Sequence, residues 1–286
     1  MTPVSSYRAL GRWLGPFFAR RFPRRFGLFE LLGLGSIEAS RRHLAIVNEL
    51  ENLRRKAGLP VLDILDFGGA EGSLGRTLRM YGLESHYRVT LADIDEAALK
   101  VAAAVANARV VTLEPEGTLP FADASFDVAV SSDVFEHIPK SARQGRADEL
   151  RRVSRLGQVH SVPADDGGHH WNSVQVDEDF AAWQRESFGA PDRWTGEHLE
   201  KGVPSLDDLR ELFPQGRISG IVSGRVWAAT MRAKYGPATP WHRVRFALTY
   251  ARQLRKLERK APFKTALIVA MVSLHVDAPL IDQDEV

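Results

Sequence analysis

Residues 64–72 read Ile64-Leu65-Asp66-Phe67-Gly68-Gly69-Ala70-Glu71-Gly72, an apolar run that ends in an acid and is followed at once by glycines. This pattern predicts a buried strand that breaks into a tight turn at the start of a helix. Glycines in such a turn let the backbone approach a ligand closely, because no Cβ stands in the way. The stretch therefore predicts a nucleoside-type cofactor at the carboxyl end of a parallel sheet, with Asp66 facing a cationic or hydrogen-donating group of that cofactor.

Two later segments repeat the pattern of a strand that ends in polar residues. Residues 89–95 read Val-Thr-Leu-Ala-Asp-Ile-Asp, and Asp93 falls about 20 residues beyond the glycines, a spacing that suits an acid accepting hydrogen bonds from ribose hydroxyls. Residues 119–139 begin with turn-forming residues, continue as an apolar strand over 126–131 and end in a polar cluster. Three such strand ends in this order predict a single ligand-binding edge.

These three segments together closely resemble the class I S-adenosylmethionine-dependent methyltransferases. Asp66 to Gly72 matches the first motif of that family, Asp-x-Gly-x-Gly-x-Gly, with Ala70 at the middle glycine. Asp93 matches the acid that holds the cofactor ribose, and residues 119–139 match the stretch Leu-Pro-Phe-x-Asp-x-Ser-Phe-Asp…Glu-His. The resemblance covers roughly residues 60–165. We expect the alanine at position 70 to cost the turn little, unless φ there is positive.

The resemblance implies both a fold and a cofactor. The implied fold is α/β: a Rossmann-like, doubly wound, mostly parallel seven-stranded sheet, with N-terminal helices and a lid or insert above the carboxyl edge. The implied cofactor is S-adenosyl-L-methionine. Its expected binding residues are Asp66, Gly68, Gly69, Ala70, Gly72, Asp93, Ile94, Glu114, Glu116, Asp133 and Phe135.

Each of these residues has an expected role. The turn glycines would shape the methionine-ribose region, Asp66 would approach the methionine ammonium group, and Asp93 would take the ribose hydroxyls. Ile94 would flank the adenine, and either Glu114 or Glu116 would receive the adenine amine. Asp133 and Phe135 would line the pocket that the cofactor shares with the acceptor.

Candidate catalytic residues are histidines, because a group with a pKa near neutrality suits the deprotonation of a hydroxyl. His137 lies in the Glu-His pair after the fourth strand, where the family often uses it to shape the pocket, so a structural role is the alternative. His169 and His170 belong to a polar zone expected above the sheet. We expect no metal, because Asp165, Asp166 and His169 match no strong ligand spacing.

Composition is consistent with a single domain and excludes a few classes. The 286-residue chain is 44% hydrophobic, has no cysteine and carries a net charge of +2. Disulfides and thiolate metal sites are thereby excluded, a reducing, cytoplasmic location is favoured, and no nucleic-acid partner is expected. Residues 1–29 contain six arginines and no acid, and residues 242–260 form a second basic block. Either they contact an anionic membrane surface peripherally, or they are the solvated faces of half-buried helices.

The chain is expected to divide into four zones. Residues 1–59 form an N-terminal helical segment and residues 60–165 the cofactor-binding core. Residues 166–216 form a substrate-facing insert, in which Trp171, Trp183 and Trp194 offer flat surfaces for a sugar or aromatic acceptor. Residues 217–286 contribute two more strands and a basic helix to the same domain. No sequence pattern indicates the oligomeric state.

The favoured function is O-methylation of a small molecule, a natural product or a glycan. One alternative is an NAD-dependent oxidoreductase, because Ala70-x-Gly72-x-x-Gly75 approximates a dinucleotide fingerprint. Against it, the glycines start late for a pyrophosphate at the helix N-terminus. The other alternative is a non-catalytic scaffold of methyltransferase type.

Overall fold

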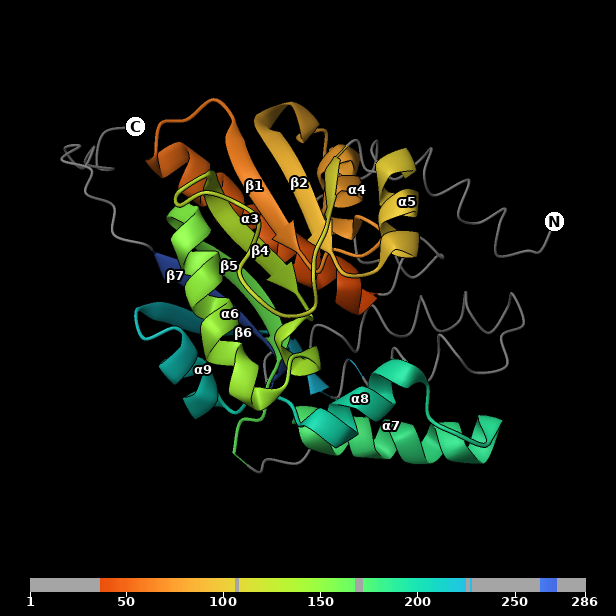
Figure 1. The fold of residues 1–286 in the computed structure, drawn as a ribbon. Coiled ribbons are helices and arrows are strands. Elements are labelled where there is room, and N and C mark those ends of the chain that lie inside the picture. The colour runs from red at the N-terminus through yellow and green to blue at the C-terminus, as the bar shows by residue number, and fades with distance from the viewer. Residues whose placement is uncertain (1–36, 106–107, 168–171, 225–226, 228–262, 272–286) are drawn as a thin grey trace.

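The computed structural model describes residues 37–105, 108–167, 172–224, 227 and 263–271 (Figure 1). The predictions for the N-terminal arginine-rich segment, for His169, His170 and Trp171, and for the basic helix lie outside these residues. Within them the chain alternates strands and helices, as the sequence predicts. The helices are α3 Ile37–Lys56, α4 Ser73–Met80, α5 Glu96–Val105, α6 Lys140–Val153, α7 Ser173–Phe188, α8 Arg193–Lys201 and α9 Leu206–Leu212, with the 3-10 turns η3 Glu84–His86 and η4 Phe135–His137.

One seven-stranded sheet organises the described residues, in the order β3-β2-β1-β4-β5-β7-β6. Its strands are β1 Leu62–Phe67, β2 Tyr87–Asp93, β3 Arg109–Thr112, β4 Phe126–Ser132, β5 Ser154–Pro163, β6 Gly216–Ser223 and β7 Phe263–Met271. The first five pair in parallel, and β7 pairs antiparallel with both β5 and β6. The chain winds outward in both directions from β1 and β4, so their carboxyl ends form the switch point where ligands bind in such sheets.

Helices cover both faces of this sheet because strand residues alternate between two apolar clusters. Ile64 and Val128 face one cluster, with α3 and α4, whereas their neighbours Leu65 and Ala129 face the other, with α6 and α9. Figure 1 shows α6 in front of the sheet and α3 behind it. The sheet is thus a buried middle layer. Because helices cover both of its faces, the carboxyl ends of its strands are the place where a ligand can bind.

Strand β5 begins earlier than the sequence predicts. The pattern predicts a helix that runs to Arg155 and a strand over 159–162, but α6 ends at Val153 and β5 starts at Ser154 without a loop. The pairing of β5 with β4 shifts register between Phe126 and Val128. Tertiary pairing with β4 holds residues 154–158 extended although Gly157 and Gln158 have little preference for strands.

Helices α7 and α8 belong to the expected insert, and they lie together beyond the arrowheads of β1 and β4 (Figure 1). The insert does not stand apart, because α9 contributes Leu209 and Leu212 to the main core. Among the described residues, no helix is both long and apolar enough to cross a bilayer.

Candidate functional site

The turn after β1 is built from left-handed backbone conformations. φ is 69° at Gly68 and 74° at Gly72, and the turn closes through a hydrogen bond of 2.9 Å from the Gly72 N–H to the Gly69 carbonyl. Ala70 also has a positive φ, 44°, so the condition under which alanine would cost little does not hold. A non-glycine residue in this region costs roughly 1–2 kcal/mol. The surrounding contacts therefore impose this turn on the chain.

Two glycines are required here by close approach. A Cβ at Gly68 would lie 2.6 Å from the Val134 side chain, which follows β4. A Cβ at Gly69 would collide with the carboxylate of Asp66. The loops after β1 and β4 are therefore in contact, and the Asp66 carboxylate lies directly beneath the turn.

Asp66 is a buried carboxylate at the end of β1. Its Oδ2 atom receives no hydrogen bond from the described residues. Burial, and secondarily the nearby charge of Asp93, raises the pKa of Asp66 to about 7. An ionised carboxylate without a hydrogen-bond donor is costly inside a protein. The position is therefore electrostatically suited to a positively charged ligand group.

Asp93 holds the turn in place. Its Oδ2 accepts a hydrogen bond of 2.8 Å from the N–H of Ala70, and its Oδ1 accepts one of 2.9 Å from the N–H of Asp95. Asp95 in turn caps α5 by accepting from the N–H groups of Ala97 and Ala98. The sequence allows either Asp93 or Asp95 as the cap of this helix, and the structure gives that position to Asp95. Asp93 is less free than expected, although each of its oxygens keeps a second acceptor site for a ligand hydroxyl.

The expected adenine-binding residues lie along the same edge. Ile94, directly after Asp93, is 59% exposed although it is a large apolar side chain. Glu114 and Glu116 are exposed in the loop that follows β3. The structure therefore leaves these three side chains accessible, and their contacts with adenine remain predictions.

The end of β4 places its two predicted residues differently. Asp133, with φ of 54°, donates its N–H to Ser161 and forms an ion pair with Arg42 of α3. Phe135 is fully buried, and its ring packs edge-on against His160 and Phe213. A side-chain contact of Phe135 with a ligand would require its ring to leave the core.

His137 lies in a group of rings formed with α8. Its Nδ1 is 2.9 Å from Glu197 Oε2, and its ring is 5.0 Å from the rings of both Trp194 and His198. Burial, aided by the charge of His198 and opposed by Glu197, lowers the pKa of His137 to about 4. The imidazole is therefore neutral at pH 7, but it is a weaker base than the near-neutral group expected from the sequence.

The structure also joins His198, a histidine of the polar zone expected above the sheet, to residues of other elements. His198 Nδ1 is 2.9 Å from Asp177 Oδ2, and the buried carboxylate of Glu136 lies next to both histidines. Glu197 is 60 positions from its partner His137. His137 and Glu197 come together only because α8 packs on η4. No spacing in the sequence could therefore have identified this pair.

Comparisons with known proteins relate this chain to methyltransferases. Residues 65–161 match a family model described as a methyltransferase domain. A protein of Mycobacterium sp. (strain KMS), named only as an uncharacterized methyltransferase, is 39% identical over 190 residues, which cover 62% of this chain and 67% of that protein. A second protein so named, from Mycolicibacterium gilvum, is 28% identical over 207 residues, 69% of this chain and 75% of that protein. Among solved structures, geranyl diphosphate C-methyltransferase of Streptomyces coelicolor is similar over 80% of each chain, with 15% identity and a TM-score of 0.45.

Proposed function

We propose, from the premise that this chain belongs to the class I S-adenosylmethionine-dependent methyltransferases, that it methylates a hydroxyl group of a small molecule, a natural product or a glycan. Membership of this family makes S-adenosyl-L-methionine the cofactor and removes the ground for the dinucleotide alternative. The acceptor and the acceptor atom are the parts that we propose. The observation that carries the choice of a hydroxyl is the neutral imidazole of His137, close to the end of β4.

The described residues fit this cofactor. Bound S-adenosylmethionine supplies a methyl group on a positively charged sulfur, next to a methionine ammonium group. Asp66 offers a buried carboxylate oxygen that receives no hydrogen bond from the described residues, and Gly69 leaves the space above it open. Asp93 keeps acceptor sites for the ribose hydroxyls, and the exposed Ile94 offers an apolar surface beside them.

The remaining task of the protein is to hold the acceptor oxygen in line with the reacting carbon. Positioning of this kind lowers the barrier because the entropy is lost on binding rather than in the reaction. A hydroxyl must also lose its proton, and a positioned group that assists this loss accelerates the reaction. Because a carboxylate accepts at His137 Nδ1, Nε2 carries the lone pair. We assign to His137 the role of promoting the loss of that proton; His169 and His170 remain predicted candidates.

Trp194 is the described aromatic residue best placed to contact an acceptor. The residue is 56% exposed, and its ring contacts His137 edge-on and lies under the guanidinium of Arg193. Trp183 instead packs on Phe180 and Phe188. An exposed indole gives a flat apolar surface with one hydrogen-bond donor, which suits a sugar ring or an aromatic phenol.

The proposal is tested by binding followed by turnover. We expect the purified chain to bind S-adenosylhomocysteine and not NAD in calorimetry. Candidate hydroxyl acceptors are then offered with isotope-labelled cofactor, and mass spectrometry locates the transferred methyl group. Labelling on nitrogen or carbon would overturn the assignment to oxygen, and a chain that binds no cofactor would favour the scaffold alternative.

Asp93→Ala should weaken S-adenosylhomocysteine binding by about 1–3 kcal/mol, the range for hydrogen bonds to a charged group. Asp95→Asn is the matched control, because it alters the next carboxylate while the helix cap keeps an acceptor. We expect its affinity to stay close to that of the unmodified chain. Equal affinities for all three proteins would mean that the ribose binds elsewhere.

A further inference from the structure

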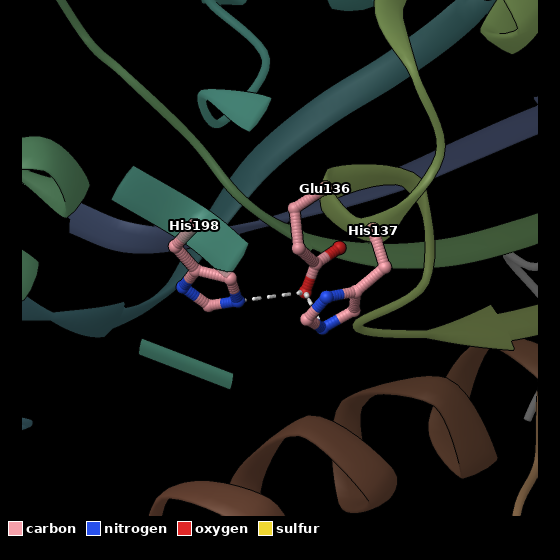
Figure 2. A group of neighbouring side chains, drawn as sticks. All are labelled: Glu136, His137 and His198. Carbon is pink, nitrogen blue, oxygen red and sulfur yellow. Dashed lines mark ion pairs between the residues drawn. The ribbon is translucent and has the colours of Figure 1, made fainter. Parts of the chain in front are cut away.

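Three side chains at the contact between η4 and α8 present ligand atoms to one point. Glu136, His137 and His198 each offer one such atom, and these atoms lie within 4.8 Å of one another. Glu136 and His137 come from η4, whereas His198 comes from α8. Figure 2 shows both imidazole rings turned toward the carboxylate of Glu136. Helix α8 of the insert therefore adds a histidine to the two side chains that follow β4.

The second nitrogen of each ring defines its tautomer. His137 Nδ1 is 2.9 Å from Glu197 Oε2, and His198 Nδ1 is 2.9 Å from Asp177 Oδ2. Since a carboxylate accepts hydrogen bonds, each Nδ1 carries a hydrogen, and Nε2 is the nitrogen of each ring that can bind an ion. Metal-binding histidines are oriented by carboxylates in this same way.

The distances between the ligand atoms leave a gap between them. His137 Nε2 is 3.9 Å and His198 Nε2 is 3.8 Å from Glu136 Oε1, which is too long for a hydrogen bond. Ligand atoms about 2.0–2.1 Å from a tetrahedral zinc ion are about 3.3 Å apart. The three atoms lie within 4.8 Å of one another, so the side chains would have to approach each other by up to about 1.5 Å to close the set around an ion.

We infer that Glu136, His137 and His198 bind one divalent transition-metal ion, for which Zn²⁺ is the best match. Two imidazoles with one carboxylate form the ligand set of catalytic zinc sites, which keep a position open for another ligand. The ligands are mostly buried, with side-chain exposures of 0%, 19% and 12%. The site differs from the aspartate and histidine spacing considered in the sequence, and no residue of that set belongs to it.

The ion would give the site a role in the reaction proposed above. Its open position suits an acceptor oxygen, and a bound ion favours the loss of the hydroxyl proton to water. His137 then acts as a metal ligand and not as the proton acceptor itself. This consequence rests on the proposed function, whereas binding of the ion does not.

Metal binding is measured on the full chain without cofactor or acceptor. Protein freed of metal by chelation and dialysis is titrated with Zn²⁺ in a calorimeter, and with Co²⁺ while its visible absorption is recorded. We expect one equivalent to bind with the spectrum of a four-coordinate site. His198→Ala and His137→Ala should each bind at least about 100-fold more weakly.

His86→Ala is the matched control, because His86 is a half-exposed histidine whose Nδ1 faces Glu51, outside this group. It should bind Zn²⁺ as the unmodified chain does. Unmodified protein that takes up no ion would overturn the inference. Undiminished binding in both His137→Ala and His198→Ala would overturn it as well.

Asp177→Asn tests the site without removing a ligand. The loss of the carboxylate behind His198 should weaken Zn²⁺ binding by about 10–100-fold while Co²⁺ keeps its four-coordinate spectrum. Circular dichroism confirms that each variant is folded. Zn²⁺ binding without methyl transfer to oxygen would contradict only the proposed function, and methyl transfer to oxygen by a chain that binds no metal would contradict only this inference.

Discussion

At the scale of single residues, two carboxylates at neighbouring strand ends have opposite environments. Asp93 receives hydrogen bonds from two backbone N–H groups. Asp66 Oδ2 receives none from the described residues, and burial raises the pKa of Asp66 to about 7. The first carboxylate stabilises the turn, whereas the second opposes folding unless a cation or a proton neutralises it.

Asp66→Asn should stabilise the chain without cofactor at pH 8, by up to about 4 kcal/mol, since each pKa unit corresponds to 1.36 kcal/mol. The folded pKa lies above the unfolded value of 3.8. The folded state therefore holds one more proton between these values, and the stability of the unmodified chain falls as pH rises from about 4 to 7. Urea unfolding at several pH values should show the gain growing over this window and levelling off above it.

The control for that experiment is Asp63→Asn, because the hydrogen bond and charge of Arg88 lower the pKa of Asp63. Asp63 contributes stability that is present above its unfolded pKa and is lost as pH falls through the lowered folded value. The substitution should therefore destabilise the chain at pH 8. If Asp66→Asn lowered the stability as well, the prediction would be wrong. The ionised carboxylate of Asp66 would then be stabilised by groups of the protein itself.

Ala70→Gly should raise the free energy of unfolding by about 0.5–1 kcal/mol. The positive φ of Ala70 costs roughly 1–2 kcal/mol, and the added flexibility of glycine offsets part of the gain. Ala103→Gly, at an exposed position in α5, should instead lower stability by about 0.5–1 kcal/mol. Thermal unfolding of both variants checks the opposite signs.

At the scale of elements, capping residues connect the two insert helices α7 and α8. Gly189 caps the C-terminus of α7 in a left-handed conformation, and Asp192 caps the N-terminus of α8 by accepting a hydrogen bond from the N–H of Thr195. Gln184 of α7 donates a hydrogen bond of 2.7 Å to Asp192. One side chain therefore caps α8 and ties it to α7, and α8 carries two members of the ring group, His198 and Glu197.

Asp192→Ala should lower stability by about 1 kcal/mol, the usual loss for a helix N-cap, and should also weaken Zn²⁺ binding. Ser205→Ala removes the cap of α9 at a comparable cost and should leave Zn²⁺ binding unchanged. Thermal unfolding and calorimetry on both variants separate a local effect on α8 from general destabilisation. Equal loss of Zn²⁺ affinity in the two would contradict the positioning role of α8.

At the scale of the whole molecule, β7 unites segments that are far apart in the chain. It pairs with β5 on one side and with β6 on the other. Its residue Ile268 is fully buried in the same cluster as Leu209 of α9 and Phe213. Strand β7, the last described segment, therefore belongs to the same core as the strands expected to bind the cofactor.

Ile268→Ala should destabilise the whole sheet by about 2–5 kcal/mol, because the deleted side chain leaves a cavity in a packed core. Val101→Ala, at a 43% exposed position in α5, should change stability by less than about 0.5 kcal/mol. Urea unfolding followed by far-ultraviolet circular dichroism provides both values. A small effect of Ile268→Ala would mean that β7 is held independently of the core.

The sequence by itself determined the sheet type, the turn after β1 and the position of α5. These features depend on residues that are neighbours along the chain, and alternating apolar residues, glycines and acids report them directly. For this reason β1, β4 and α5 lie where the pattern predicts, and Asp66 and Asp93 lie at the same edge.

Only the tertiary structure decided the features that depend on packing between distant segments. Asp93 holds Ala70 at a positive φ, β4 extends the start of β5, and the core draws in the ring of Phe135. The meeting of Glu136, His137 and His198 likewise depends on α8 lying against η4. Contacts between segments about 60 residues apart follow no local period, because they are set by how whole helices fit over the sheet.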